Sequence, residues 1–332
     1  MNTILMKAPA QRLRWRPTAL APEALLLLGG IGLYLLVPDD LGFATRVLIG
    51  ALFALSLDLV LGYGGIVTLG QAALFGSGAY AAGLFALHLS GNPLLGLVAG
   101  AAAGAATAGL TGWLVLRSHG LTAVMITIAV AQVLLEVASK WRSVTGGDDG
   151  LSGIAVQPLF GRFEFDFFGH TGYWYALVVL LLVFAALRRL VAAPFGLTLV
   201  GLREDRVRMV ALGCRLQRRL GTAYLIGGAV AGLAGALSAQ VTQVVGLSSL
   251  SFAQSAEALV MLVLGGTGRL WGAILGTAVF MGVHHLASSI DPLRWMLVIG
   301  VMLLGVVLFM PQGLSGAVVS LWRRLQRRQE AA

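Results

Sequence analysis

The sequence is poor in charge, in lysine and in cysteine. Charged residues make up 11% of its 332 residues, against roughly 25% in an ordinary soluble domain. Its single cysteine, Cys214, excludes an internal disulfide and has no partner thiol for a structural metal site. Neither of the two lysines, Lys7 and Lys140, follows a glycine-rich loop, and no G-x-x-x-x-G-K-[ST] motif occurs. The chain therefore has no P-loop, and any energy that it uses must come from another polypeptide or from an ion gradient.

The sequence also lacks the motifs of membrane-embedded enzymes. Such enzymes hold a nucleophile and a base, or paired ionisable groups, together at one membrane face. No G-x-S-x-G, H-E-x-x-H or H-x-x-x-x-D pattern is present. We therefore expect no catalytic role for this chain.

Apolar residues are in excess, at 58% of the chain. A globular core could not bury so many, whereas each crossing of a bilayer needs about 20. We predict an all-α, polytopic bundle of about ten transmembrane helices, within a range of eight to ten. The candidate spans are residues 19–37, 43–61, 65–89, 93–116, 121–139, 173–190, 220–245, 255–267, 270–290 and 294–311. The glycine-rich span 65–89 and the short span 255–267 are predicted to be broken or re-entrant, which requires protein or water around them.

The distribution of positive charge predicts the orientation. With the N-terminus inside, and with Arg188 and Arg189 at the end of the span 173–190 counted with the inner loop, the inner segments contain 18 of the 23 lysine and arginine residues, as the positive-inside rule requires. Both termini are then cytoplasmic, with a basic N-terminus at 1–18, a transmembrane region at 19–316 and a basic tail at 317–332. We predict no cleavable signal peptide. Two connections are long, an outer loop at 140–172 and an inner loop at 191–219.

The inner loop contains an amphipathic segment between residues 201 and 213. Apolar positions alternate there with charged ones at helical spacing, and Gly213 stands where a helix would end. The apolar positions are Leu202, Val207, Val210, Ala211 and Leu212. By its pattern alone, this helix could lie on the membrane surface against anionic lipid or dock onto a partner protein.

Five stretches between residues 60 and 316 resemble one family in their order along the chain. They are VLGYGGIVTLGQAALFGSGAY (60–80), TGGDDGLSGI (145–154), FGLTLVGLREDRVRMVALGCRLQRRLGTAYLIGGAVAGLAGAL (195–237), VMLVLGGTGRLWGAILG (260–276) and FMPQGLSG (309–316). They are similar to permease subunits of bacterial ABC importers for branched-chain amino acids, most closely to the LivM type.

The resemblance implies that residues 201–213 form a coupling helix, which sits in a groove of an ATPase subunit. The implied coupling residues are Arg203, Glu204, Asp205, Ala211, Leu212 and Gly213. Between them, Arg206 to Val210 is more basic and less rich in alanine than the family pattern. ATP would be bound by the partner subunits, so we expect no cofactor and no metal in this chain.

The resemblance also implies the partners and the cargo. The partners would be a second permease subunit, identical or related, two cytoplasmic ABC ATPase subunits and a periplasmic substrate-binding protein, in the cell inner membrane and without nucleic acid. The cargo would be a branched-chain or similar small amino acid. A urea or short-amide importer is the alternative, because the shared motifs serve coupling and folding more than substrate choice. The implied docking residues for the binding protein are Thr145, Gly146, Gly147, Asp149 and Gly150.

Polar residues and glycines at bilayer depth indicate a translocation path. Buried polar groups are costly in a membrane and usually face protein or a water-filled route. A broken helix can turn bare N–H and C=O groups toward a solute. The candidate path residues are Asp58, Gly62, Gly64, Gly65, Thr68, Gln71, Gly265 and Gly266.

Other polar residues in the spans have simpler expectations. For Gln132, Gln240 and Gln243 we expect hydrogen bonds between helices. A proton-coupled transporter would need a chain of ionisable groups through the membrane, and Asp58, Glu136 and Glu257 are too few and too scattered for one.

Two glycine-rich strings resemble each other. VLGYGGIVTLG (60–70) and VLGGTGRLWGAILG (263–276) both begin with V-L-G and continue with glycines, each at the inner end of a predicted span. Internal duplication and chance in a glycine-rich chain both account for this.

Overall fold

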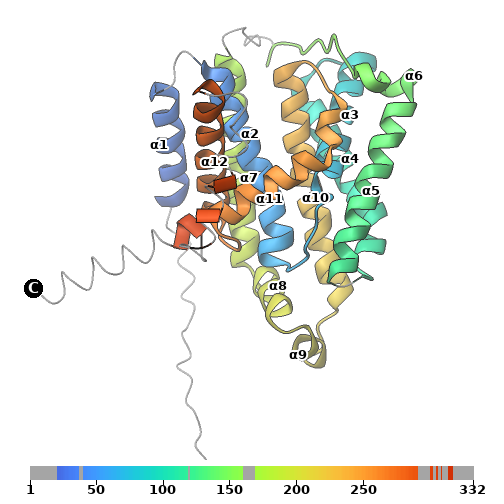
Figure 1. The fold of residues 1–332 in the computed structure, drawn as a ribbon, viewed down its shortest axis with the longest axis vertical. Helices are drawn as coiled ribbons and strands as arrows, with labels where there is room; N and C mark the ends of the chain where they lie inside the picture. The colour runs from blue at the N-terminus through green and yellow to red at the C-terminus, as the bar shows by residue number, and fades with distance from the viewer. Residues whose placement is uncertain are drawn as a thin grey trace, which may run out of the picture.

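The computed structural model describes residues 21–36, 40–118, 120–159 and 169–290, and in the last segment residues 300–301, 304–305, 308 and 313–316. These residues form a bundle of helices, and the pairing of Leu151 with Val245 is an isolated β-bridge (Figure 1). The all-α prediction is thus confirmed for the described residues. Both terminal segments, most of the predicted span 294–311 and residues 160–168 of the outer loop lie outside them.

The helices follow one another through mostly short connections. In chain order they are α1 (Ala21–Leu36), α2 (Leu41–Leu57), the π-helix η2 (Asp58–Tyr63), α3 (Gln71–His88), α4 (Pro93–Val115), α5 (Leu121–Lys140), α6 (Arg142–Thr145), the 3-10 helix η3 (Gly147–Asp149), α7 (His170–Ala192), α8 (Pro194–Glu204), α9 (Arg206–Ala211), α10 (Leu216–Thr242), the 3-10 helix η4 (Leu247–Leu250), α11 (Phe252–Gly265) and α12 (Leu270–Ile290).

Six of the described helical segments are long and apolar enough to cross a membrane. They are α2 continued by η2, α4, α5, α7, α10 and α12. Figure 1 shows α6 at one end of the bundle and α8 and α9 projecting from the opposite end. The extramembrane segments are therefore separated onto the two ends, as a membrane protein requires.

The two spans predicted to be irregular differ from the others. The predicted span 65–89 becomes helical only at Gln71, and residues 65–70 are not helical, so the predicted break is confirmed. Helix α11 has 14 residues, which gives about 21 Å at 1.5 Å per residue, short of the roughly 30 Å hydrocarbon layer. Figure 1 shows it running obliquely across the middle of the bundle.

Glycines bring α3, α4 and α10 into close contact. In α4, Gly100 and Gly104 lie four residues apart, and in α10 Gly228 and Gly232 have the same spacing. A Cβ on Gly104 would collide with the carbonyl oxygen of Gly228 and lie 2.8 Å from the Cα of Gly232. Such small-residue faces let membrane helices pack backbone to backbone, where van der Waals contact replaces the hydrophobic effect.

Polar contacts inside the bundle join other helix pairs. Gln240 of α10 donates from Nε2 to the carbonyl of Pro93 at 2.8 Å and accepts at Oε1 from the Tyr175 hydroxyl at 3.0 Å. The expected interhelical hydrogen bond of Gln240 is confirmed. For Gln243 it is wrong, because this residue ends α10 in a left-handed conformation (φ 55°) and is exposed.

The glycine contacts predict the effect of a single added methyl group. Gly104→Ala should lower the midpoint of thermal unfolding in detergent, because overpacking a close contact costs about 1–3 kcal/mol. Gly109→Ala, in the same helix, is the matched control, because its Cβ would meet only Leu225 Cδ2, at 3.4 Å, and alanine favours a helix. Equal midpoints for the two variants would show that the α4–α10 contact is not tight.

Candidate functional site

The inner end of α2 is an irregular helix followed by a break. After Leu57 the chain continues as the π-helix η2, and the Gly64 and Ile66 amides donate to the carbonyls of Leu59 and Val60, both at 3.1 Å. Gly65 follows with φ +65°, a conformation that costs glycine little. The chain then turns back into the bundle and starts α3. Single π-turns of this kind occur frequently at functional sites.

A buried carboxylate joins this break to a distant turn. Asp58 is 0% exposed, and its Oδ1 accepts a hydrogen bond of 2.7 Å from the amide of Gly268, 210 residues away in sequence. Gly268 belongs to the turn between α11 and α12. A Cβ on Gly62 would collide with Asp58 Oδ1, so glycine is required there for the close approach. The two similar strings at 60–70 and 263–276 therefore lie against each other.

Two arginines from the inner loop hold the same backbone. Arg203, in the last turn of α8, donates from Nη1 to the carbonyl of Gly62. Arg206, in the first turn of α9, donates from Nη2 to the carbonyl of Gly65 at 3.3 Å. Three segments thus converge, and we call the group the coupling junction: Asp58, Gly62, Gly65, Arg203, Arg206 and Gly268.

The junction places the Asp58 carboxyl group and the Arg203 guanidinium beside bare backbone. The second oxygen of Asp58, Oδ2, is buried without a hydrogen bond to any described residue. A Cβ on Gly268 would lie 2.8 Å from Arg203 Nη1, so the guanidinium reaches the same turn that the carboxylate holds. A buried carboxylate is tolerated where a hydrogen bond and a nearby positive charge compensate its lost hydration.

The inner loop forms two helices, whereas a single helix over 201–213 was predicted. Asp205 separates α8 from α9 in an extended conformation (φ −150°, ψ 100°), and its carboxylate accepts from the Arg208 amide at 3.0 Å as the N-cap of α9. Capping by aspartate favours a new helix start at this point. The predicted single apolar face is also wrong, because Leu202 is buried whereas Val207, Val210 and Leu212 are exposed.

The predicted stop at Gly213 is confirmed. Gly213 has φ +85°, its amide donates to Val210 O at 2.9 Å, and the Cys214 amide donates to Met209 O at 3.0 Å. These two bonds form the Schellman motif that ends helices at a left-handed glycine. Glu204, Asp205, Ala211 and Leu212 are exposed around α9. The end of the loop therefore presents apolar, acidic and basic side chains outside the bundle, the last including Arg208 and Arg215.

The remaining candidate path residues lie in closed packing. Thr68 and Gln71 are buried like Asp58. The Thr68 hydroxyl accepts from the Gly70 amide at 3.1 Å, and Gln71 Nε2 donates to Ser56 Oγ at 3.0 Å. Other hydroxyls complete the break: Thr127 of α5 accepts from Leu69 N at 3.2 Å, and Ser255 of α11 accepts from Ala72 N at 2.8 Å.

The glycines of the candidate path have different surroundings. Gly64 caps η2, and Gly266 ends α11 with φ +98°. A Cβ on Gly265 would collide with the carbonyl of Gly272 in α12. Gly65 lines a cavity of about 250 Å³, which Arg206 also reaches. The structure thus brings Asp58, Gly62 and Gly65 to the Gly266–Gly268 turn, while Thr68 and Gln71 lie further along the break.

The outer loop residues 145–150 form a tight, internally bonded structure. Thr145 is buried, and its hydroxyl donates to the carbonyl of Trp141 at 2.8 Å. Gly146, Gly147 and Gly150 all have positive φ. Leu151 and Val245 exchange backbone hydrogen bonds of 2.8 and 2.9 Å, which attach the loop to the end of α10. Asp148 and Asp149 are exposed.

One surface that sequence reasoning missed is the outward face of α5. Gln132 and Glu136 are both exposed there, four residues apart, and with Val133 and Val137 they line a shallow depression of about 600 Å³. The expected interhelical hydrogen bond of Gln132 is therefore not formed within the described chain. The i, i+4 spacing of two polar residues in an apolar span could have predicted a polar helix face. Only the burial in the structure shows that no other helix of the described chain covers this face.

These features define a class of protein: a multi-pass membrane protein with broken helices inside its bundle and a projecting loop at one end, as in membrane permeases. The chain matches the family model described as "Branched-chain amino acid transport system / permease component" over residues 41–307. It is similar to the "High-affinity branched-chain amino acid transport system permease protein LivM" of Escherichia coli (strain K12). The identity is 31% over 321 residues, covering 88% of this chain and 73% of the relative.

The LivM protein of Salmonella typhimurium (strain LT2) has the same identity and coverage. No solved structure matches the chain. The chain therefore belongs to the family of permease components of branched-chain amino acid transport systems and is a non-catalytic membrane subunit of a transporter.

The junction predicts that Asp58 stabilises the fold. Asp58→Ala should lower the free energy of unfolding by about 1–3 kcal/mol, because the partly buried Gly268 amide loses its acceptor. Asp58→Asn keeps an oxygen acceptor and should lose less. Asp149→Asn, on the exposed outer loop, is the control. Thermal unfolding of the purified protein ranks the stabilities of the three variants. Wild-type stability in Asp58→Ala would contradict the assigned contact.

Proposed function

We propose that this chain is the membrane subunit of an ATP-driven importer that carries branched-chain or similar small amino acids across the inner membrane. Family membership and the names of the two relatives support the cargo. ATP is bound by separate ATPase subunits, and a soluble binding protein delivers the substrate from outside. The observation that carries the proposal is the contact of Arg203 in the projecting loop with Gly62 at the helix break.

The end that carries α8 and α9 faces the cytoplasm in this proposal. The positive charge of the chain supports that orientation, because residues 188–219 contain eight arginines and no lysine. Helix α2 runs toward the end of the bundle that carries α8 and α9, so the preceding helix α1 begins at that end. The N-terminus is then cytoplasmic. The even number of predicted spans would bring the C-terminus to the same side.

The coupling junction transmits force in this mechanism. An ATPase subunit docks on α9, where the exposed side chains Val207, Val210 and Leu212 supply apolar anchors. Movement of α8 displaces the carbonyl of Gly62, because Arg203 is hydrogen-bonded to it. Because Asp58 is bonded to Gly268, the α2–α3 break and the α11–α12 turn shift together. The helices around the path then change from an outward-open to an inward-open arrangement.

The open face of α5 is the proposed lining of the path, opposite a second permease subunit. Exposed glutamine and glutamate side chains are costly against lipid but favourable beside a hydrated route. Gln132 offers amide donors, and Glu136 lies 3.7 Å from Lys140 in an exposed ion pair. Donors for a carboxylate and acceptors for an ammonium group are thus available to a zwitterionic substrate. The outer loop, with Asp149 exposed, faces the binding protein.

The mechanism predicts uncoupling by one substitution in α8. Arg203→Gln should reduce uptake of labelled leucine about tenfold or more, because a charge-assisted hydrogen bond contributes about 1.5–3 kcal/mol, while the ATPase subunits still co-purify and hydrolyse ATP. Arg117→Gln is the matched control, since Arg117 lies outside α8 and α9 and its guanidinium stacks on the Trp113 ring. Normal uptake in proteoliposomes of Arg203→Gln would refute the proposed coupling.

The proposed path can be tested by thiol labelling. With Cys214, the only native cysteine, replaced by alanine, Gln132→Cys should react with a membrane-impermeant maleimide, and substrate should slow the reaction. Val178→Cys, on the exposed face of α7, should stay unlabelled because lipid covers it. If the two positions react equally, or if neither reacts, α5 does not line a hydrated path.

A further inference from the structure

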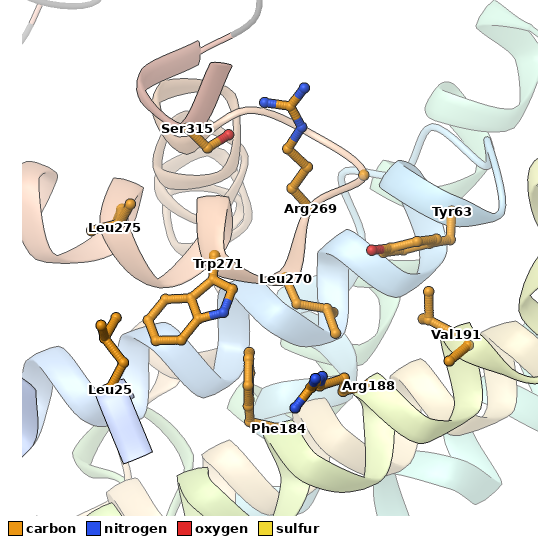
Figure 2. Close-up of a pocket in the computed structure, with 12 residues that line it drawn as sticks. Leu25, Tyr63, Phe184, Arg188, Val191, Arg269, Leu270, Trp271, Leu275 and Ser315 are labelled. Atoms are coloured by element: carbon orange, nitrogen blue, oxygen red, sulfur yellow. The ribbon is translucent and has the colours of Figure 1, made fainter. Parts of the chain in front are cut away.

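A large pocket lies beside the coupling junction and is separate from the proposed path. Its volume is about 670 Å³, and its walls come from α1, α7 and α12. Figure 2 shows Leu25, Phe184, Trp271 and Leu275 around it. The walls are mostly apolar, so the pocket suits hydrocarbon better than a hydrated amino acid.

The side chains of Arg269 and Ser315 lie on one side of this pocket. Arg269 is exposed there and forms no ion pair within the described part of the chain. The Ser315 hydroxyl, 5% exposed, is buried without a hydrogen bond to a described residue. In Figure 2 these two residues lie on one side, and Phe184 and Arg188 lie on the opposite side. Arg188 is bonded to both oxygens of Glu23 at 2.7 Å, so that its charge is compensated.

The pocket is placed where a membrane lipid can enter. Helix α1 lies at the edge of the bundle in Figure 1, and its side chains Leu25, Leu28 and Leu35 are exposed. Trp271, half-buried in the wall, is the residue type that membrane proteins place near the interface. Arg269 sits in the turn before α12, toward the end of the bundle that carries α8 and α9.

We infer that this pocket binds an anionic phospholipid of the leaflet that adjoins α8 and α9. The headgroup phosphate lies against Arg269 and the Ser315 hydroxyl, and an acyl chain lies along Trp271, Leu275 and Leu25. Basic pockets between membrane helices on the cytoplasmic side bind anionic headgroups in this way. A free phosphate would leave the apolar walls unoccupied.

The charges of the chain's own terminal segments argue against them as occupants. Residues 1–20 contain four basic and no acidic side chains, and residues 317–332 contain four arginines and one glutamate. Both segments would bring further positive charge toward Arg269. An anionic amphiphile is complementary to the pocket in both charge and polarity.

The lipid would also contact the force-transmitting turn. Gly268 and Tyr63 line the pocket, and Gly268 is the residue that Asp58 holds. An occupied pocket therefore supports the α11–α12 turn from the side opposite the arginine contact.

Lipid retention tests the inference directly and without ATP. The proposed transporter that contains this chain is placed in nanodiscs of phosphatidylglycerol and phosphatidylcholine. It is then released into mild detergent, and native mass spectrometry identifies the lipids that stay bound. Wild type should retain one phosphatidylglycerol per chain in preference to phosphatidylcholine. Arg269→Gln should retain about fivefold less, the order expected for one lost arginine contact to an anionic lipid. Leu275→Trp, which fills the pocket without changing charge, should also lose the lipid.

Arg117→Gln is the matched control, because Arg117 stacks on Trp113 at 4.2 Å and does not line the pocket. It should retain phosphatidylglycerol as wild type does, and excess inorganic phosphate should not displace the lipid. Equal retention in wild type, Arg269→Gln and Leu275→Trp, equal retention of the two lipids by wild type, or displacement by phosphate alone would overturn the inference. Because no transport is measured, failure here is distinct from failure of the proposed function.

Discussion

The hydrogen bond between the Asp58 carboxylate and the Gly268 amide joins the two interruptions of the helical bundle. A carboxylate placed inside a membrane protein is unfavourable unless donors and positive charge surround it. This requirement draws the α11–α12 turn against η2 and brings the guanidinium of Arg203 to the same backbone. The broken helix, the turn and the inner loop are thus interdependent. Removing one of them leaves a buried polar group of another without its partner.

Helix α2 lies between two groups of helices, and the junction is at its inner end. On one side, glycine faces pack α3, α4 and α10 too closely for side chains to adjust. On the other side, α1 is held to α7 by the Glu23–Arg188 pair, and the Tyr173 hydroxyl donates to the carbonyl of Gly30 at 2.6 Å. Movement within either group would break close packing, so relative movement of the two groups is easier. The junction is therefore well placed to change their arrangement.

Much of the fold could be predicted from the sequence because membrane spans depend on composition over some 20 residues. The break before Gln71 followed from the density of glycine, and the stop at Gly213 from the helix pattern. The division of the inner loop at Asp205 was missed because one N-cap contact to Arg208 outweighs the amphipathic period. The predicted face failed for the same reason, since the division turns Leu202 inward and Val207 outward.

The site was less predictable because it depends on contacts between distant segments. Nothing local places Gly62 beside Gly268, although the similarity of their two strings was visible. Gln132 illustrates a second limit. Its sequence context shows that it is polar within a span, but not whether another helix of the same chain covers it. The resemblance supplied the predicted role of the inner loop, whereas only the fold shows that Arg203 and Arg206 bond the backbone of the broken helix.

The central claim is that the inner loop and the α11–α12 turn move together. Pulsed electron paramagnetic resonance distances test it in the assembled, cysteine-free transporter, with spin labels at Leu197 of α8, at Thr267 and at Leu110, which lies on the exposed side of α4. Between the nucleotide-free and ATP-bound states, the Leu197–Thr267 distance should stay constant while the Thr267–Leu110 distance changes. A change in the Leu197–Thr267 distance with Thr267 fixed relative to Leu110 would contradict the account.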